Sequence, residues 1–511
     1  MAGSLGAVDC PKGDGPRQPV ERHGLPAERY IQVSFTMHNI SKNGLREHTT
    51  IPHTEVIHHK RQCAFLLVGL VAVFIIGGGQ FYYLLVMSDT LRQVQGVIFQ
   101  FKLIFPVFFF IFTLLTLARY WLIMFFAFLE TSKVEAFNVS SRYDTPKVSI
   151  LVPAYNEEHC ITETLQSLIL IDFPSLEIIL VDDGSTDNTY AKAEPFAGMH
   201  DDKVIKIFRK FQGGKASALN LAFRYCMGEY IVCMDADSQL APDSVRMLLR
   251  RFVHNNIGAC AGQVVIRNRC NLLTHLQALE YMLMNGTARM FQSYFASVLI
   301  APGPLTMFRR RVLQELQDHW RSENHGGELH PGKVAGPWES DTFAEDTKLS
   351  LSILTSGADI VYEPAALCFT TAPTQVQKLL HQRYRWNRGN IQAARRTWRR
   401  WCQSPSQRPS LGIWLTVFII ESILWSILDV IGLSMFLLLM MVSGGFGPAY
   451  MWYLLLLLVD MNAVAFCATN SYHSYGTILL VPVYRTYFGL LLQVNALFSL
   501  FDELKDRRMH W

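Results

Sequence analysis

The sequence carries little charge and no block of it: 17% of its 511 residues are Asp, Glu, Lys or Arg, and the net charge at pH 7 is +4. Since no basic arm or tail occurs, we expect no nucleic-acid partner. The ten cysteines form no C-x-x-C pair, which argues against a zinc site or a disulfide framework and favours reduced thiols. Half of the residues are hydrophobic, too many for an ordinary soluble enzyme, so we expect a soluble domain joined to membrane segments.

The glycine motifs of common nucleotide-binding folds are also missing. The first expected strand-to-helix turn reads PAYNEE rather than G-x-G-x-x-G, and no G-x-x-x-x-G-K-[ST] occurs, which argues against Rossmann and P-loop folds. Asp183, Ser185, Asp187 and Glu194 have the spacing of calcium-loop ligands. Because Asn188 stands where that loop requires glycine, we interpret this spacing as chance.

Long apolar runs are present at both ends of a polar central stretch. A run of about 20 apolar residues crosses the hydrocarbon core of a bilayer as a helix. We therefore expect two transmembrane helices within 62–130 and further transmembrane helices within 411–502. The first run of the second group is so long that either it breaks in two or one run lies in the membrane interface. The runs are 63–87, 103–129, 411–442, 450–469 and 477–501.

Basic residues flank the apolar runs on the side of the central stretch and of both tails. By the positive-inside rule, the protein is expected to be a multi-pass membrane protein, of the plasma membrane, with its central domain over 146–375 in the cytoplasm. The tails 1–61 and 503–511 are expected there too, and the first, rich in Gly, Pro, His and charge, is expected to be disordered. The flanking basic residues are Lys60, Arg61, Lys133, Arg142, Arg395, Arg396, Arg399 and Arg400.

Four ionisable residues lie within the apolar runs: Glu421, Asp429, Asp460 and Arg485. Because charge is costly inside a membrane, such residues usually face a cavity or each other. The alternative is that they lie near the ends of spans and extend to the membrane surface. The sequence leaves both interpretations open.

The central stretch has an α/β pattern. Apolar, β-rich runs occur in VSILVPAYNEE, LEIILVDDGSTDNT, KVIKIFRK and EYIVCMDADS, and helix-like segments such as CITETLQSLILI and KASALNLAFRYC lie among them. This alternation predicts a mixed, mostly parallel sheet. Three of the runs end in polar or acidic residues, and ligands of such sheets bind at the carboxyl ends of the strands.

The segment DADS places two carboxylates, Asp235 and Asp237, at the end of a predicted buried strand. Residues separated by one position in a strand point to the same face, so their charges repel unless a cation joins them. Hard divalent cations take such oxygen ligands together with phosphates of a substrate. The alternative role for both acids is to cap the following helix.

The segment AED, with Glu345 and Asp346, follows a glycine-rich polar loop. An acid at the mouth of a cleft can act as a general base that removes a hydroxyl proton. On this segment alone, capping of a helix by Asp346 is the more ordinary role.

The segment GGKASALN places two glycines and Lys215 at the start of a predicted helix. Backbone amides at a helix N-terminus favour anions, and a lysine adds a positive charge. An ordinary loop leading into a surface helix is an equally plausible interpretation.

The segment HQRYRWNRGN, residues 381–390, combines several cations with Trp386 shortly before an apolar run. Arginine binds phosphate in a fork geometry that lysine lacks, and an indole offers a flat apolar face on which a sugar ring can stack. Residues 376–410 are therefore expected to form amphipathic interface helices that carry this segment. Anchoring to lipid headgroups is the alternative for the arginines at 395–400.

These motifs, in this order, resemble those of the inverting family-2 glycosyltransferases of GT-A fold. More narrowly, they resemble the membrane-integrated processive synthases of cellulose, chitin, hyaluronan and poly-N-acetylglucosamine. The resemblance runs from about 148 to 390 and rests on VPAYNEE, VDDGSTD, GGKASALN, DAD, APGPLTMFRR, AED and QRYRW. Two departures, AED and APGP, lie near the expected acceptor site and leave the acceptor open.

The resemblance implies a donor site and a metal. The residues that it assigns to the uridine are Tyr155, Glu157, Asp182 and Asp183. It also implies that Lys215 and Asp235 contact the nucleotide sugar, and that Asp237 binds Mg²⁺ or Mn²⁺ bridging the diphosphate.

The resemblance also implies a catalytic base and an acceptor site. Asp346 matches the base, with Glu345 beside it. Gln382, Arg385 and Trp386 match the Q-x-x-R-W signature, in which the arginine meets the diphosphate and the tryptophan packs at the acceptor.

The function expected from the resemblance is polymerisation of a β-linked polysaccharide from a UDP-sugar, with export across the membrane. The expected partners are the UDP-sugar donor, the growing glycan acceptor, the lipid bilayer and an accessory membrane subunit. UDP-N-acetylglucosamine is the preferred donor, with UDP-glucose second and alternation with glucuronic acid left open. The alternatives are transfer of a single sugar to a lipid carrier or glycolipid, and a silent channel or scaffold subunit.

Overall fold

The structure is a computed structural model that describes residues 61–71, 75, 78–79, 97–133, 145–323, 333–339, 343–403, 409–442, 447–469 and 475–505. The expected disordered tail lies almost wholly outside the described residues. So do much of the first apolar run and most of the C-terminal tail.

The core of the domain is one sheet of nine strands with the order β3-β4-β2-β1-β5-β8-β7-β9-β6. The sheet is mixed and mostly parallel, as the sequence predicts. The strands are β1 Val148–Ala154, β2 Leu176–Asp182, β3 Gly198–His200, β4 Lys203–Arg209, β5 Tyr230–Cys233, β6 Gln239–Leu240, β7 Ile257–Ile266, β8 Thr306–Arg309 and β9 Asp359–Thr370.

The four strands β4, β2, β1 and β5 run parallel to one another, and β7 and β9 form a second long parallel pair. At the edge of the sheet, β3 pairs antiparallel with β4. The antiparallel pairings of β5, β7 and β9 with β8 or β6 are short. Every residue of β2 and of β7 is buried, which explains why their sequences are nearly continuous apolar runs rather than alternating ones. The parallel pairing brings the carboxyl ends of β1, β2 and β5 to one edge of the sheet.

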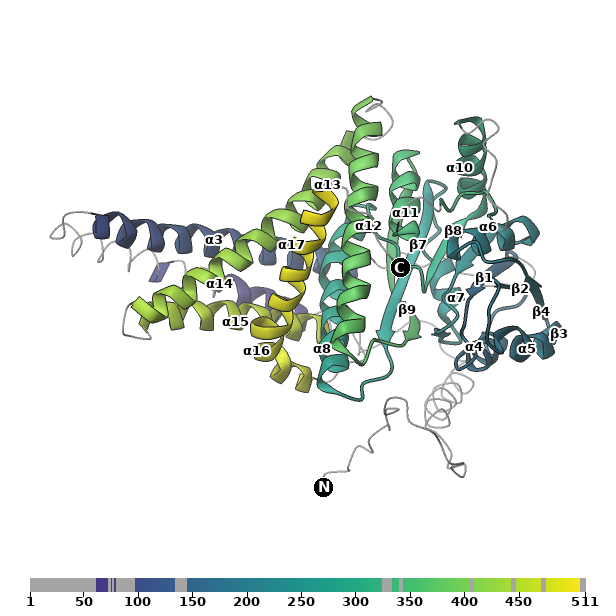
Figure 1. Cartoon of the computed structure of the whole chain (residues 1–511), viewed down its shortest axis with the longest axis horizontal. Helices are drawn as coiled ribbons and strands as arrows, with labels where there is room; N and C mark the ends of the chain where they lie inside the picture. The colour runs from purple at the N-terminus through teal and green to yellow at the C-terminus, as the bar shows by residue number, and fades with distance from the viewer. Residues whose placement is uncertain are drawn as a thin grey trace, which may run out of the picture.

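Helices cover the sheet and extend away from it on one side (Figure 1). The α-helices are α3 Val97–Ser132, α4 Ile161–Ile169, α5 Thr189–Ala193, α6 Lys215–Tyr225, α7 Ser244–Leu249, α8 Leu272–Leu283, α9 Met290–Tyr294, α10 Arg310–Glu323, α11 Glu345–Thr355, α12 Val376–Gln403, α13 Pro409–Ile419, α14 Trp425–Val442, α15 Gly447–Ala468, α16 Val481–Val483 and α17 Gly489–Leu504. Short 3-10 helices span Glu194–Phe196 and Tyr475–Leu480, and π-helical turns span Met284–Arg289, Ile420–Leu424 and Tyr484–Phe488.

Helix α12 stands between the sheet and the apolar helices α3, α14 and α15 (Figure 1). It packs on α11 on one side and on α13 and α17 on the other. The contact with α11 is close, because a Cβ at Gly389 would lie 2.7 Å from the Cβ of Ala344. Glycine at this position therefore lets α12 lie directly against the AED segment.

Two stretches, Ile111–Ser132 and Gly476–Leu504, are long and apolar enough to cross a membrane by length and composition. Shorter apolar helices cover Arg61–Val71, Ser410–Ile419 and Tyr453–Ala468. The long run at 411–442 does not break in two: α13 passes into α14 through the π-helical turn at Ile420–Leu424.

The ionisable residues within the apolar helices face each other. Arg119 and Glu421 form a bidentate pair between α3 and the first π-helical turn of this region. Arg485 lies 3.4 Å from Asp460 and 3.9 Å from Asp429. Of the two interpretations of the sequence, mutual pairing is therefore the one that the structure adopts.

Eight cysteines among the described residues are free thiols. Cys270 is disulfide-bonded, so the expectation of reduced thiols throughout is wrong at this residue.

Candidate active site

Asp182, the last residue of β2, and Asp183, which follows it, are held by contacts with β4 and the loop after it. Asp182 is fully buried, with Oδ2 3.0 Å from Arg209 Nε on β4. Asp183 accepts the N–H groups of Gly213 at 3.0 Å and Gly214 at 2.7 Å, and Lys210 donates to it as well. Asp183 thus fixes the glycine loop after β4, whereas Asp182 fixes the end of β4 itself. The binding of uridine by either carboxylate stays a prediction.

The glycine loop leads into α6, which begins at Lys215 as the sequence predicts. Gly214 precedes the helix with φ +89°, a backbone conformation that side chains with a Cβ rarely adopt. Asp183 thus holds the two amides of this loop just before the point where Lys215 enters the site.

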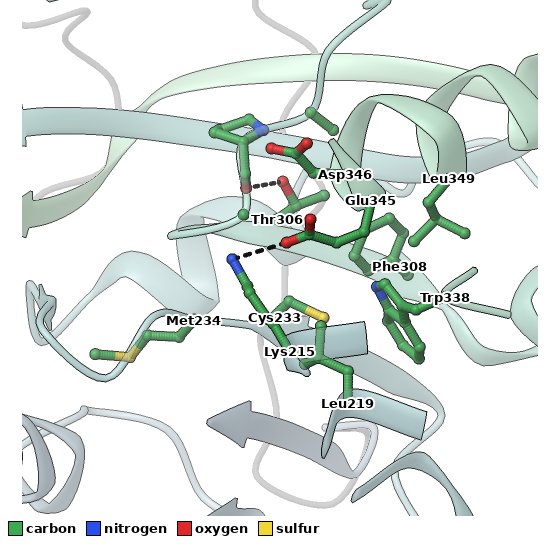
Figure 2. A pocket seen from close by; sticks show the side chains of 13 residues that line it. Lys215, Leu219, Cys233, Met234, Thr306, Phe308, Trp338, Glu345, Asp346 and Leu349 are labelled. Carbon is green, nitrogen blue, oxygen red and sulfur yellow. Dashed lines mark hydrogen bonds and ion pairs between the residues drawn. The ribbon is translucent and has the colours of Figure 1, made fainter. Parts of the chain in front are cut away.

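Lys215 is the centre of a cluster of acids (Figure 2). Its Nζ lies 2.6 Å from Asp235 Oδ1 and 3.2 Å from Glu345 Oε1. Burial alone would lower the pKa of Lys215, but Asp235, Glu345 and Asp346 raise it above its ordinary value. One permanent cation therefore faces three acids that come from two distant segments of the chain.

Asp235 and Asp237 lie in the turn after β5, not within the strand, so the predicted strand geometry is wrong for them. The reason is that β5 pairs with β1 only as far as Cys233. The capping alternative is wrong as well, because the next helix, α7, begins after Asp243. The turn nevertheless holds both carboxylates at the carboxyl end of the strand.

Asp237 differs from Asp235 in its partners. Its hydrogen-bond donors among the described residues are hydroxyls: Ser238 at 3.1 Å, Thr371 at 3.3 Å and Thr370 at 3.5 Å. Burial first, and then the charge of Asp235, raises the pKa of Asp237. Burial and the charges of Asp237 and Asp235 likewise raise the pKa of Glu157 to about 7. The described residues include no group of three or more His, Cys, Asp or Glu side chains that could hold a metal by itself.

Tyr155, predicted to contact the uridine, follows β1 and is exposed. Asn156, the next residue, has φ +56° and its side chain accepts the N–H of Thr186 at 2.9 Å. Tyr155 is thus presented at the same edge of the sheet as the acids.

Glu345 and Asp346 begin α11, at the same cluster. Ala344, not Asp346, is the N-cap residue and supplies no side-chain cap. Asp346 Oδ1 nevertheless accepts the first-turn N–H of Thr347 at 2.7 Å, so the capping role considered for Asp346 is met in part. Burial and the neighbouring Glu345 charge raise the pKa of Asp346 to about 6. Burial also acts to raise the pKa of Glu345, but Lys215 and hydrogen bonds hold it below the ordinary value. Adjacent acids whose pKa values are driven apart are typical of acid and base sites.

Gly303, within APGP, is a site residue whose role the sequence does not reveal. A Cβ at this position would lie 2.8 Å from Lys215 Nζ, 3.7 Å from Asp235 Oδ1 and 3.8 Å from Asp346 Oδ2. The 301–303 segment is held against α11 because Ser350 Oγ accepts the N–H of Ala301 at 3.0 Å. The absence of a side chain at 303 thus leaves the lysine and two acids free to meet.

Asn220 is a second such residue. Its side chain donates to the carbonyls of Val334 at 2.9 Å and Trp338 at 2.8 Å, and accepts the N–H of Trp338 at 3.1 Å. It lies on α6, one turn beyond Lys215, and so ties this helix to the segment that leads into Glu345. The motif letters GGKASALN include Asn220, but nothing in the sequence indicates a partner more than 100 residues away.

The Q-x-x-R-W residues share one face of α12, since positions i, i+3 and i+4 of a helix are neighbours. Arg385 is exposed and near enough to Glu345 to lower the pKa of that acid. Trp386 and Gln382 are partly buried. Thr347, beside Asp346, donates to Asn390 Oδ1 at 2.7 Å, which joins this helix to the acids.

The other two arginines of the segment 381–390 have structural partners. Arg383 pairs with Glu280 of α8 at 2.7 Å, and Arg388 pairs with Glu503 of α17 at 2.9 Å. Of the three, Arg385 is the one with no ion pair among the described residues.

A cavity of about 260 Å³ lies between α12 and the apolar helices. Its wall is mixed, because α12 and α17 each contribute both polar and apolar residues to it. The polar lining includes Glu280, Arg383, Asn387, Asn390, Glu421 and Gln493.

Residues 149–317 match the family model Glycosyl transferase family 2. A poly-beta-1,6-N-acetyl-D-glucosamine synthase of Staphylococcus epidermidis is 29% identical over 64% of this chain and 73% of its own length. The synthase of that name from Staphylococcus aureus strain COL is 27% identical over 57% of this chain and 65% of its own length. The match to this second relative thus spans just under two thirds of it.

Two solved structures also align with the chain. A mannosyltransferase of Pyrobaculum calidifontis in complex with GDP-Man and Mn²⁺ aligns with a TM-score of 0.46 and 20% identity, over 77% of this chain and 98% of its own. TarS of Staphylococcus aureus, residues 1–349 in complex with UDP, aligns with a TM-score of 0.31 and 18% identity, over 48% of this chain and 68% of its own.

Proposed function

We propose that this chain, which contains a glycosyl transferase family 2 domain over residues 149–317, polymerises a β-linked polysaccharide from a UDP-sugar and exports it across a membrane. The names of its relatives favour UDP-N-acetylglucosamine as the donor. The observation that carries the proposal is the convergence of Lys215, Asp235, Glu345 and Asp346 at the carboxyl edge of the sheet.

Asp346 is the proposed general base. An acid with a pKa of about 6 is mostly ionised at neutral pH and still binds a proton more strongly than an ordinary aspartate. It would remove the proton of the acceptor hydroxyl while that oxygen attacks the anomeric carbon and UDP leaves. Glu345 remains ionised beside Lys215, so it keeps the lysine charged and in place.

The donor is proposed to bind across the strand ends. Tyr155, Glu157 and the pair Asp182–Asp183 are the proposed uridine contacts. Lys215 and Asp235 would contact the nucleotide sugar. Arg385, exposed at the edge of the site, would bind the diphosphate and stabilise the charge that develops on it.

A divalent cation, Mg²⁺ or Mn²⁺, fits the residues around Asp237. Lys215 already neutralises Asp235, whereas the partners of Asp237 among the described residues are hydroxyls. Glu157 adds a third carboxylate nearby. Magnesium is usually bound by one or two carboxylates together with phosphate oxygens, so the lack of a complete protein cage is compatible with it. When bound, the ion would neutralise charge on the departing diphosphate.

The acceptor end is proposed to lie at Trp386, where α12 separates the site from the apolar helices. Gln382, Arg385 and Trp386 share a helix face there, and the 260 Å³ cavity begins on the other side of the same helix. The two candidate spans support a membrane location. We place the catalytic domain in the cytoplasm, the enzyme in the plasma membrane as a multi-pass protein, and an accessory membrane subunit among its partners.

The test is the size of the product made by purified protein in lipid nanodiscs with labelled UDP-N-acetylglucosamine or UDP-glucose. We expect a long polymer from one donor, and a loss of on the order of 1,000-fold in rate for Asp346→Asn, because removal of a general base costs that much. A single-sugar lipid product would contradict polymerisation. No transfer from any donor, in wild type and variant alike, would contradict the whole proposal.

A further inference from the structure

Arg383 lies inside the segment HQRYRWNRGN but not at a position of the Q-x-x-R-W signature. It is only 6% exposed, whereas Arg385, two residues on, faces solvent. A buried guanidinium is costly unless a partner compensates its charge. Glu280 of α8 supplies that partner at 2.7 Å.

The guanidinium of Arg383 contacts both partly buried members of the signature, Trp386 and Gln382. Its central carbon lies 4.3 Å from the centroid of the Trp386 ring, within the range of a cation–π contact. Its NH1 group donates to Gln382 Oε1 at 3.2 Å. Arg383 therefore lies against the indole while its other end is held by a different helix.

Such an arrangement limits the orientations of the indole. A planar guanidinium stacks on an aromatic face in a way that an ammonium group cannot copy, and Glu280 fixes where that plane lies. The position of Trp386 thus depends on α8, an element that contributes no residue to the cluster around Lys215.

We propose that Arg383, held by Glu280, is a positioning residue that sets the orientation of Trp386 for the sugar at the acceptor end. The proposal rests on the proposed function, because that function places the acceptor on Trp386. The competing interpretation is that the ion pair only fastens α12 to α8.

Helix α12 offers a matched control for this competing interpretation. Arg388 is 3% exposed, and its pair with Glu503 of α17 has a length of 2.9 Å. It fastens the same helix with the same chemistry, but the ring that its guanidinium approaches is that of Tyr384, at 5.8 Å. Glu503→Gln therefore weakens the attachment of α12 without removing support from Trp386.

The first measurement needs no turnover. The protein is labelled with 5-fluorotryptophan in nanodiscs, and the ¹⁹F resonance of Trp386 is assigned by its disappearance in Trp386→Phe. We expect this resonance to shift or broaden in Glu280→Gln and Arg383→Met, to return toward the wild-type position in Glu280→Asp, and to stay unchanged in Glu503→Gln. An unchanged resonance in both of the first two variants would overturn the proposal.

The second measurement compares product length with UDP release. We expect Glu280→Gln and Arg383→Met to shorten the polymer at least fivefold while KM for the donor changes less than twofold. An equal loss of length in Glu503→Gln would assign the pair to simple attachment and overturn the proposal. If wild type makes no polymer, the proposed function fails, whereas the ¹⁹F comparison still decides whether Arg383 positions the indole. Glu280→Gln is nearly isosteric, so the comparison survives if Arg383→Met fails to fold.

Discussion

The cluster around Lys215 and the charged group among the apolar helices contain the same kinds of residues in different proportions. Around Lys215, one cation faces three acids. Among the apolar helices, Arg119 and Arg485 face Glu421, Asp429 and Asp460. The first group has a formal charge of −2 and the second a formal charge of −1.

The difference in balance and in geometry indicates different roles. Arg119 and Glu421 meet through two parallel hydrogen bonds, which is the strongest geometry that an arginine and a carboxylate can adopt. Lys215 instead divides one ammonium between Asp235 and Glu345, and no cation among the described residues forms an ion pair with Asp346. The excess of negative charge around Lys215 suits the binding of a ligand that arrives with a metal cation. The arginine–carboxylate pairs among the apolar helices instead hold these helices together.

After the loss expected for Asp346→Asn, the largest expected effect comes from removing the single cation of the first group. Lys215→Met should lower the rate of UDP release on the order of 100-fold, the loss typical of removing one electrostatic contact to a reacting group. The rate is measured at saturating donor. Arg246→Met is the matched control, because it removes a cation from an exposed pair, 3.7 Å from Asp172, in the same domain. Equal losses in both variants would contradict a special role for Lys215.

The next effect is on pH dependence. Asp346 acts as a base only when ionised, and its pKa is raised to about 6, so kcat/KM should fall about tenfold per pH unit below pH 6. Lys215 lowers the pKa of Asp346 and Glu345 raises it. The acid limb should therefore move to higher pH in Lys215→Met and to lower pH in Glu345→Gln. Shifts of the same sign in both variants would contradict this electrostatic assignment.

The sequence predicts the individual strands, helices and charged residues of the candidate site better than it predicts the contacts between them. The strands, the lysine at the start of α6 and the acids at strand ends follow from local patterns. Asn220 and its partners near 334–338 do not, because hydrogen bonds between segments over 100 residues apart leave no periodic signal. The different roles of the three arginines in the segment 381–390 are likewise not predictable from the sequence. Arg383 and Arg388 are buried because Glu280 and Glu503, which are distant in the sequence, pair with them, whereas Arg385 has no such partner among the described residues.

The signature at DADS shows a further limit. The sequence predicts that DADS ends the buried strand, with Asp235 and Asp237 on one face of it. Pairing with β1 ends at Cys233, so the chain turns earlier than the apolar pattern indicates. Strand ends are set by the neighbouring strand, which a local pattern does not contain.

The smallest expected effect on activity comes from the group among the apolar helices. Asp460 is 5% exposed and lies 3.4 Å from Arg485, whose other acid, Asp429, is at 3.9 Å. Asp460→Asn should lower the free energy of unfolding by about 2 kcal/mol, less than the loss of a sole buried partner because Asp429 remains. UDP release should stay within about twofold of wild type.

The measurement is the midpoint of thermal unfolding in detergent, beside the rate of UDP release. Asp172→Asn serves as the control, since this acid is well exposed and exposed ion pairs contribute little to stability. A loss of activity in Asp460→Asn without a lower midpoint would mean that the charged helices take part in the reaction. The distinction between a substrate-binding group around Lys215 and a structural group among the apolar helices would then be wrong, because both groups would affect the reaction.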